Sequence, residues 1–379
     1  MGYLIILLII LSLFFFKRKN LKYYFIIIVF ILAIVAFNFE PSKEYDLYRH
    51  FNMLDNCRLY GFNYIINHPD YENLPVGATY FYLSSLIPTN GFLPMVTTII
   101  SYMSVFIIIN KFIEEKEWKK SAILLAIFSF LCMYNYLGLI SGIRNKICIS
   151  IVFYILYKDL IEKKNFVKCM IGYIALALFH PSIFVVIALR LLLLVKDKKL
   201  QSIIKILLLL WSFLKNVILS ILSKFNNFSI VSYIVTKMNS YDLAEATAVA
   251  NVPLYTFVYF TRNVIILLIF LEYYRKNKNN KRFETYLIFS SYLICFVFGA
   301  LREYHFFIRM SELLLLVSLP ITIAFFSYTE PKKSIYPYSQ KIYNTLLKLF
   351  LIIESILFLI FYIVGQYQIL LWGIIIWEN

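Results

Sequence analysis

The sequence predicts an all-helical protein that crosses a membrane many times. Of its 379 residues, 61% are hydrophobic and only 15% are charged, and one soluble core cannot hide that much apolar surface. Its long Leu, Ile and Phe runs lack the polar alternation of a barrel strand, and backbone amides in lipid need internal partners, so the spans are helices. Since a span takes about 20 residues, we expect about 12 transmembrane helices in a single membrane domain over residues 1–379.

The first predicted helix covers residues 1–16 and is followed by Lys17, Arg18 and Lys19. A cleaved signal peptide has the opposite order, with its basic residues before the apolar run. Because Lys and Arg are enriched on the cytoplasmic side, we expect a retained helix whose N-terminus is outside. A second helix, 23–39, then returns the chain to the outside.

The longest polar stretch, residues 40–90, is predicted to be external. Its first part, 40–75, carries six acidic residues against three basic ones. Residues 76–90 are too few to span comfortably and end in a Pro-Thr-Asn-Gly turn, which indicates a re-entrant or interfacial helix on the same face. We expect a second external loop over 223–253.

The remaining apolar segments complete the expected twelve spans. Residues 169–195 are flanked by lysines and contain His180-Pro181, so we expect two short helices in a hairpin whose tip is outside. The segment 365–377 is too short to assign. The other predicted spans are 92–110, 121–137, 147–157, 203–222, 254–272, 285–301, 310–328 and 342–364.

The formal charge of +16 follows from this topology. The predicted inner segments hold 23 of the 37 Lys and Arg residues, as the positive-inside rule requires. Nucleic-acid binding is therefore not needed to explain the basic excess, and we expect no nucleic-acid partner.

The polar residues that remain on the predicted outer side indicate an anion site. Arginines near the bilayer boundary are costly unless they snorkel or bind something, and guanidinium groups bind phosphate oxygens through two parallel hydrogen bonds. For Arg144 and Arg309 alone, a snorkelling helix end is the alternative. The outer residues are His50, His68, His180, His305, Arg49, Arg144, Arg302 and Arg309.

Several other kinds of chemistry lack their motifs. There is no Gly-rich phosphate loop, nucleophile elbow or His-Glu-x-x-His pattern. The spacing of the four histidines matches no recurrent metal site, and the five cysteines suggest no disulfide framework. We expect neither a cofactor nor a metal.

Several short motifs together resemble the EpsG family, which is related to the Wzy-type polysaccharide polymerases. The most specific part is the interval from Arg144 to His180, and the resemblance covers roughly residues 20–330. The motifs are Gly142-Ile143-Arg144, the Lys-rich turn at 158–168, Ala177-Leu178-Phe179-His180-Pro181-Ser182, Tyr45-Asp46-Leu47-Tyr48 and the late Arg309.

The resemblance implies a GT-C-like, metal-independent membrane glycosyltransferase. Such an enzyme joins oligosaccharide repeat units carried on undecaprenyl diphosphate into O-antigen, capsule or exopolysaccharide, on the external face of the bacterial cytoplasmic (inner) membrane. Its expected partners are this lipid-linked oligosaccharide, membrane lipid, and the flippase and chain-length regulator of the same pathway.

The resemblance also implies roles for individual residues. The expected catalytic residues are Arg144, which stabilises the leaving diphosphate, and His180 or Asp46, which acts as the base. The expected substrate-binding residues are Arg309, Arg302, Arg49, Tyr45, Tyr48 and His305. Two alternatives stay open for the candidate bases, because His180 could merely cap the hairpin turn and Asp46 could be a solvated loop charge.

Two other functions remain open from the sequence. A transporter or flippase of the same lipid-linked sugar also needs a cationic cavity, but should carry charge at mid-membrane depth. A membrane acyltransferase that modifies the same glycans could use His180 as a base without an arginine cluster.

Overall fold

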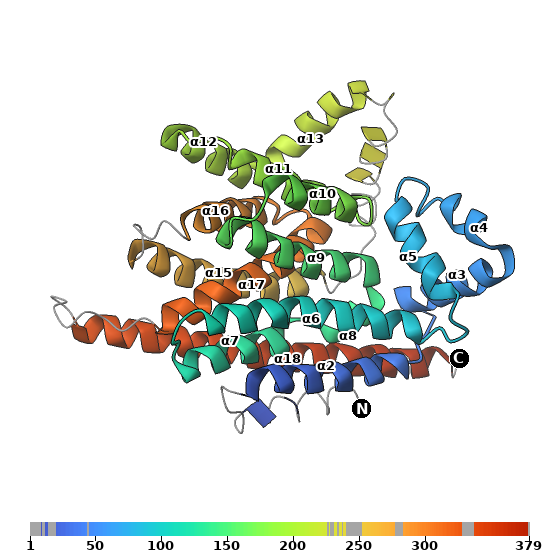
Figure 1. Cartoon of the computed structure of the whole chain (residues 1–379), viewed down its shortest axis with the longest axis horizontal. Coiled ribbons are helices and arrows are strands. Elements are labelled where there is room, and N and C mark those ends of the chain that lie inside the picture. The colour runs from blue at the N-terminus through green and yellow to red at the C-terminus, as the bar shows by residue number, and fades with distance from the viewer. Residues whose placement is uncertain are drawn as a thin grey trace.

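The computed structural model of this chain describes mainly residues 20–43, 45–225, 252–276, 283–327 and 337–377, which are mostly helical, and no β-strand occurs in these ranges (Figure 1). In chain order the elements are α2 (Leu21–Phe37), α3 (Asp46–Tyr60), α4 (Phe62–Ile66), α5 (Pro75–Ser85), α6 (Phe92–Glu114), α7 (Lys120–Met133), α8 (Tyr136–Ser141), α9 (Ile143–Leu156), the π-helical turn η3 (Tyr157–Ile161), α10 (Phe166–Ala177), α11 (Ile183–Leu192), α12 (Lys198–Leu209), α13 (Trp211–Leu222), the 3-10 turn η4 (Ser223–Phe225), α15 (Val252–Lys276), α16 (Glu284–Gly299), α17 (Tyr304–Ser327) and α18 (Pro337–Trp377). The predicted first helix and most of the predicted loop at 223–253 lie outside the described residues.

Fewer helices qualify as membrane spans than the sequence predicted. Among the described residues, α6, α15, α17 and α18 are long and apolar enough to cross a membrane, and the pair α12–α13 adds a fifth if it counts as one span. The expected twelve spans are therefore not confirmed. One reason is that helix breaks divide the apolar runs. In the predicted span 121–137, α7 ends at Met133, and a new helix, α8, begins after Asn135, whose side chain accepts from the Gly138 backbone N–H.

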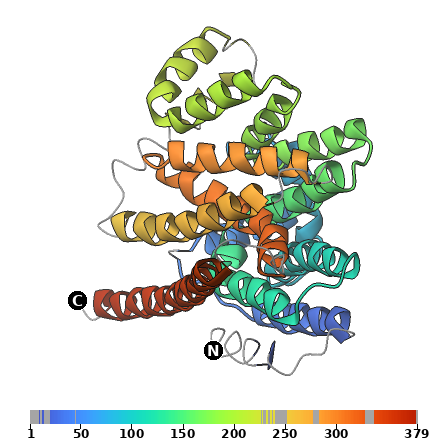
Figure 2. The same ribbon diagram turned by 90° about the vertical axis from the view of Figure 1, so that its left-hand side faces the viewer.

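Helix α17 forms the centre of the bundle, and α7, α9, α15 and α16 pack around it. Of its most apolar stretch, 94% of the residues are buried, whereas only 33% are buried in α15 and in α18. The last helix, α18, lies along one side of the molecule and continues through residues 365–377, which the sequence left unassigned (Figure 2). The bundle therefore has one fully enclosed helix and two that expose much of their apolar surface.

The predicted hairpin at 169–195 is confirmed as two short helices, α10 and α11, which pack together. A buried ion pair fastens them to the end of α9. Arg190 of α11 donates to both carboxylate oxygens of Asp159 in η3, at 2.5 and 3.0 Å, and the Tyr173 hydroxyl of α10 donates to the same carboxylate at 3.2 Å. All three side chains are buried, so one carboxylate joins three consecutive elements.

The predicted single span at 203–222 is instead broken. Helices α12 and α13 meet at an angle of 91° around Leu210. Two contacts with α16 and the turn after it hold the break: the Ser212 hydroxyl donates to the Gly299 carbonyl, and Lys215 forms a buried ion pair with Glu303. Hydropathy alone could not show this break, because the residues on both sides of Leu210 are apolar.

Gly299 is expected to be irreplaceable at this crossing. A Cβ atom there would lie 1.9 Å from the Leu208 carbonyl oxygen, which is backbone and cannot turn aside. We expect Gly299→Ala to cost about 1–3 kcal/mol of stability through overpacking, measured by thermal unfolding of the detergent-purified protein. The control is Gly172→Ala, whose new Cβ would meet only the flexible end of Ile155 at 2.9 Å. Equal unfolding temperatures for the two variants would contradict the expected clash at Gly299.

The predicted loop at 40–90 is a folded helical unit, which we call the 46–85 unit after the residues of α3, α4 and α5. It lies at one end of the bundle (Figure 1). Its small core includes Leu54, Phe81 and, from the bundle, Ile143 of α9. Arg58 fixes the C-terminal end of α5 by donating to the Ser85 and Ile87 carbonyls at 3.0 and 2.7 Å. The unit therefore holds a defined position against the start of α9.

Candidate functional site

Three parts of the chain that are distant in sequence meet at the first turn of α9. Ile143 is buried in the core of the 46–85 unit. Asn145 contacts the turn between α10 and α11, where the Ser182 hydroxyl donates to its Oδ1 at 3.3 Å. The rings of Tyr80 in α5 and Phe179 in that turn lie 5.3 Å apart between centroids. The start of α9 is therefore enclosed by the 46–85 unit and the α10–α11 turn.

Arg144, the second residue of α9, lies against the 46–85 unit. Its Nη1 donates to the Asp70 carbonyl at 3.1 Å, and its guanidinium carbon lies 4.8 Å from the centroid of the Tyr71 ring. The side chain is half-buried. This is its one hydrogen bond in the part of the chain that the structure describes, and a guanidinium has five N–H donors. Arg144 is thus held in place with donors left to bind an anion.

His50 of α3 belongs to the same site, and the sequence analysis had left it without a role. Its ring is buried, and its Nδ1 makes no hydrogen bond with any described residue. Burial, followed by the positive charge of Arg144, lowers the pKa of His50 from 6.5 to about 3, although Asp46 and Asp70 oppose this. His50 is therefore neutral at physiological pH and can offer a ring nitrogen to a hydroxyl group.

His180 lies in the α10–α11 turn and is buried. Its Nδ1 accepts from the backbone N–H of Ser182 at 3.3 Å and lies 2.8 Å from the Ser182 hydroxyl oxygen. The backbone N–H and the hydroxyl of Ser182 thus both hold the His180 imidazole in its orientation, and the same hydroxyl connects it to Asn145. The Asn145–Ser182 contact joins the turn that carries His180 to the start of α9, and the meeting of Arg144 and His180 on the external face stays a prediction.

The predicted residues at the start of α3 form a more open group. Asp46 and Arg49 are exposed and form an ion pair one helical turn apart. Tyr45 precedes the helix and packs edge-on against Phe39, with 6.0 Å between centroids, and Tyr48 is half-buried. The charges of Asp46 and Arg49 both act on His50, so this group borders the Arg144 site.

The late basic residues lie in the turn before α17 and at the start of that helix. The exposed Arg302 lies over the Phe213 ring of α13, at 5.2 Å from the centroid. His305 and Arg309 are both half-buried and lie one turn apart at the start of α17. The convergence of Arg302 and Arg309 with Arg144 on one face therefore stays a prediction.

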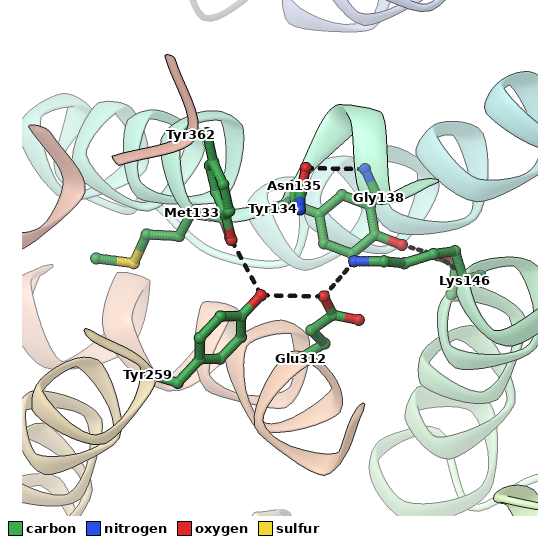
Figure 3. Close-up of polar contacts among 9 residues, drawn as sticks. Met133, Tyr134, Asn135, Gly138, Lys146, Tyr259, Glu312 and Tyr362 are labelled. Carbon is green, nitrogen blue, oxygen red and sulfur yellow. Dashed lines mark hydrogen bonds and ion pairs between the residues drawn. The ribbon is translucent and has the colours of Figure 1, made fainter. Parts of the chain in front are cut away.

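A second polar cluster lies inside the bundle and was missed in the sequence. Lys146 of α9 forms a buried ion pair with Glu312 of α17, and its ammonium also lies 4.9 Å from the centroid of the Tyr134 ring. The Tyr259 hydroxyl donates to Glu312 at 3.4 Å and lies 3.0 Å from the Tyr362 hydroxyl (Figure 3). Four helices thus contribute to one continuous polar contact network.

Two further charged residues belong to this interior region, Arg262 of α15 and Glu354 of α18. Arg262 is fully buried, and the Glu354 carboxylate accepts from the Thr261 hydroxyl at 2.6 Å. The sequence did carry a signal for them, because ionisable residues within apolar spans are functional candidates by default.

The described residues contain no group of three His, Cys, Asp or Glu side chains placed to hold a metal ion. All five cysteines are free thiols, and four of them are buried. Metal independence stays a prediction.

A comparison with known protein families decides the family. The model of the EpsG family matches residues 21–372. The chain belongs to the EpsG family. Among curated proteins and solved structures, none matches it. The EpsG family is associated with polymerase-type, glycosyltransferase-like activity in polysaccharide biosynthesis, and the apolar helices of this EpsG-family protein agree with a location in a membrane.

Proposed function

We propose that this EpsG-family protein polymerises oligosaccharide repeat units carried on undecaprenyl diphosphate, at the external face of the bacterial cytoplasmic membrane. The observation that carries the proposal is the fixed guanidinium of Arg144 beside the neutral, buried His50, at the start of a helix whose next residue, Asn145, contacts the turn that carries His180. The product is O-antigen, capsule or exopolysaccharide, and the partners are the lipid-linked oligosaccharide and the flippase and chain-length regulator of the same pathway.

The reaction transfers a growing chain from its lipid diphosphate to a hydroxyl group of the next repeat unit. The bond between the anomeric carbon and the diphosphate oxygen breaks, and negative charge develops on that oxygen. Arg144 stabilises this charge. Asp46 or His180 is the base that takes the hydroxyl proton. The proposal extends to a GT-C-like fold and to reaction without a metal.

The remaining predicted residues take supporting roles in this proposal. Tyr45, Tyr48 and Arg49 line the path of the sugar beside Asp46. Arg309, with Arg302 and His305, supplies further contacts to the diphosphate from the start of α17.

A flippase of the same lipid-linked oligosaccharide is the second candidate function. The observation that favours it is the charge inside the bundle, since Lys146, Glu312 and Arg262 are all buried in helices of the core. A transported head group would need polar partners at this depth, whereas a polymerase needs them only near one face.

Deletion of the gene in the native host distinguishes the two functions. We expect the surface glycan to lose its ladder of long chains and to keep a single repeat unit, and expression of the full chain should restore the ladder on a gel. Complete loss of surface glycan would instead indicate export, and an unchanged ladder would contradict both functions.

A further inference from the structure

Helix α15 carries a buried arginine whose hydrogen-bonding groups are not satisfied within the protein. Arg262 is 0% exposed and lies eight residues after Leu254 and fourteen before Lys276 in a candidate membrane span. None of its three guanidinium nitrogens has a hydrogen-bond partner among the described residues. A buried charge without a partner strongly destabilises a protein. An arginine in this state therefore indicates that a ligand supplies the missing acceptor atoms.

Aromatic rings stabilise the positive charge of Arg262 but do not accept hydrogen bonds from its N–H groups. Its guanidinium carbon lies 4.4 Å from the centroid of the Tyr259 ring and 5.0 Å from that of Phe358. A ring face attracts the charge, but the N–H groups point outward in the plane of the guanidinium and need acceptor atoms. The two rings thus position the guanidinium group and leave its N–H donors for a ligand.

The neighbouring carboxylates bind other donors. Glu312 pairs with Lys146, and Glu354 accepts from Thr261 at 2.6 Å. Neither forms an ion pair with Arg262 within the described part of the chain. The charge of Glu312 is therefore offset by Lys146, which leaves Arg262 and Glu354 as the two charges that a ligand would meet.

The contact between α15 and α18 offers a route from the lipid to Arg262. These two candidate spans are the least enclosed, with 33% of their windows buried, and Glu354 and Thr261 bridge them directly beside Arg262. Parting the helices breaks this bridge and moves Glu354 away on α18. Apolar side chains along the exposed face of α18 fit a lipid chain: Leu346, Leu349, Phe350, Ile353, Ile356 and Leu357.

We propose that Arg262 anchors an intramembrane binding site for a phosphoryl group carried on a lipid, which enters between α15 and α18. Phosphate oxygens match the guanidinium fork, and the lipid chain replaces the contact between the two helices. The inference rests on the proposed function only for the identity of that lipid, an isoprenoid diphosphate. The site is separate from Arg144, which lies at the start of α9 beside the 46–85 unit.

The test is isothermal titration of the full chain, purified in detergent, with farnesyl diphosphate, farnesol and inorganic pyrophosphate as probes. We expect Arg262→Gln to weaken farnesyl diphosphate binding by about tenfold or more, the loss of one charge-assisted contact. The matched control is Arg275→Gln on the same helix, where the arginine is exposed and paired with Glu272, and it should bind as the wild type does. Equal binding by Arg262→Gln would overturn the proposal. Pyrophosphate binding as tightly as farnesyl diphosphate would overturn the lipid assignment.

Two further measurements separate binding from folding. Without ligand, Arg262→Gln should unfold at or above the wild-type temperature, because an unsatisfied charge has been removed; a lower temperature would mark Arg262 as structural and overturn the site. In Thr261→Cys/Glu354→Cys, oxidation should abolish farnesyl diphosphate binding and reduction should restore it. If the oxidised variant still binds farnesyl diphosphate, the lipid does not enter between α15 and α18. These assays need no polymerisation, so a chain that binds through Arg262 but makes no polymer contradicts only the proposed function.

Discussion

Arg144→Ala is expected to lower polymerisation by about 10²-fold or more, the effect of removing one fixed donor that stabilises developing charge. In the native host, this should appear as loss of the long-chain ladder with one repeat unit still displayed. The protein itself should still reach the membrane in normal amount, because Arg144 is half-buried and its close contacts in the 46–85 unit are the Asp70 carbonyl and the Tyr71 ring.

Arg144→Lys tests whether the positive charge of residue 144 is enough or whether the planar guanidinium group is needed. Lysine keeps the positive charge but lacks the planar fork, so we expect a shortened ladder between those of the wild type and Arg144→Ala. The control is Arg275→Ala, since Arg275 is an exposed arginine of α15 that forms an ion pair with Glu272 on the same helix. A full ladder in Arg144→Ala would exclude this residue from the active site.

Asp159→Ala is expected to cost about 3–5 kcal/mol of stability, because it leaves the Arg190 guanidinium buried without its carboxylate. Both side chains are almost inaccessible, at 3% and 10% exposed, and Arg190 uses two nitrogens on this one partner. Thermal unfolding in detergent measures the loss. Because η3, α10 and α11 all meet at Asp159, the α10–α11 turn with His180 should also become more accessible to hydrogen exchange.

Removing both charges tests whether the unpaired Arg190 guanidinium causes the loss of stability. Asp159→Leu/Arg190→Leu should recover most of the stability, since replacing a buried pair by apolar groups is often neutral. Glu272→Ala is the matched control for a broken pair, because Arg275 is 64% exposed and such a pair is worth about 0–1 kcal/mol. An equal loss in Glu272→Ala and Asp159→Ala would contradict the importance of burial.

The candidate site was only partly predictable. Arg144 and His180 could be placed near one another because each stands at the end of an apolar segment and the lysine turn lies between them. His50 could not be placed, since a histidine in a polar stretch looks solvated; its pKa falls only because α3 folds onto α5 and α9 and buries the ring beside Arg144. The orientation of the His180 ring depends in the same way on its contacts with Ser182.

The break between α12 and α13 is one reason why the described helices do not confirm the twelve expected spans. Hydropathy counts apolar residues along the chain, and it is equally high on both sides of Leu210. What bends the chain there is the close approach of Leu208 to Gly299 and the Lys215–Glu303 pair, which are contacts with residues about 90 positions later.

By itself, the sequence determined that this is a helical membrane protein of the EpsG family, because composition and short motifs are local properties that survive without knowledge of contacts. The tertiary structure alone decided which polar groups pair. It showed that Lys146 is balanced by Glu312, whereas Arg262 lies between two rings with no acceptor among the described residues. Pairing depends on distances between helices that are far apart in the chain, and a linear pattern of charges contains no such distances.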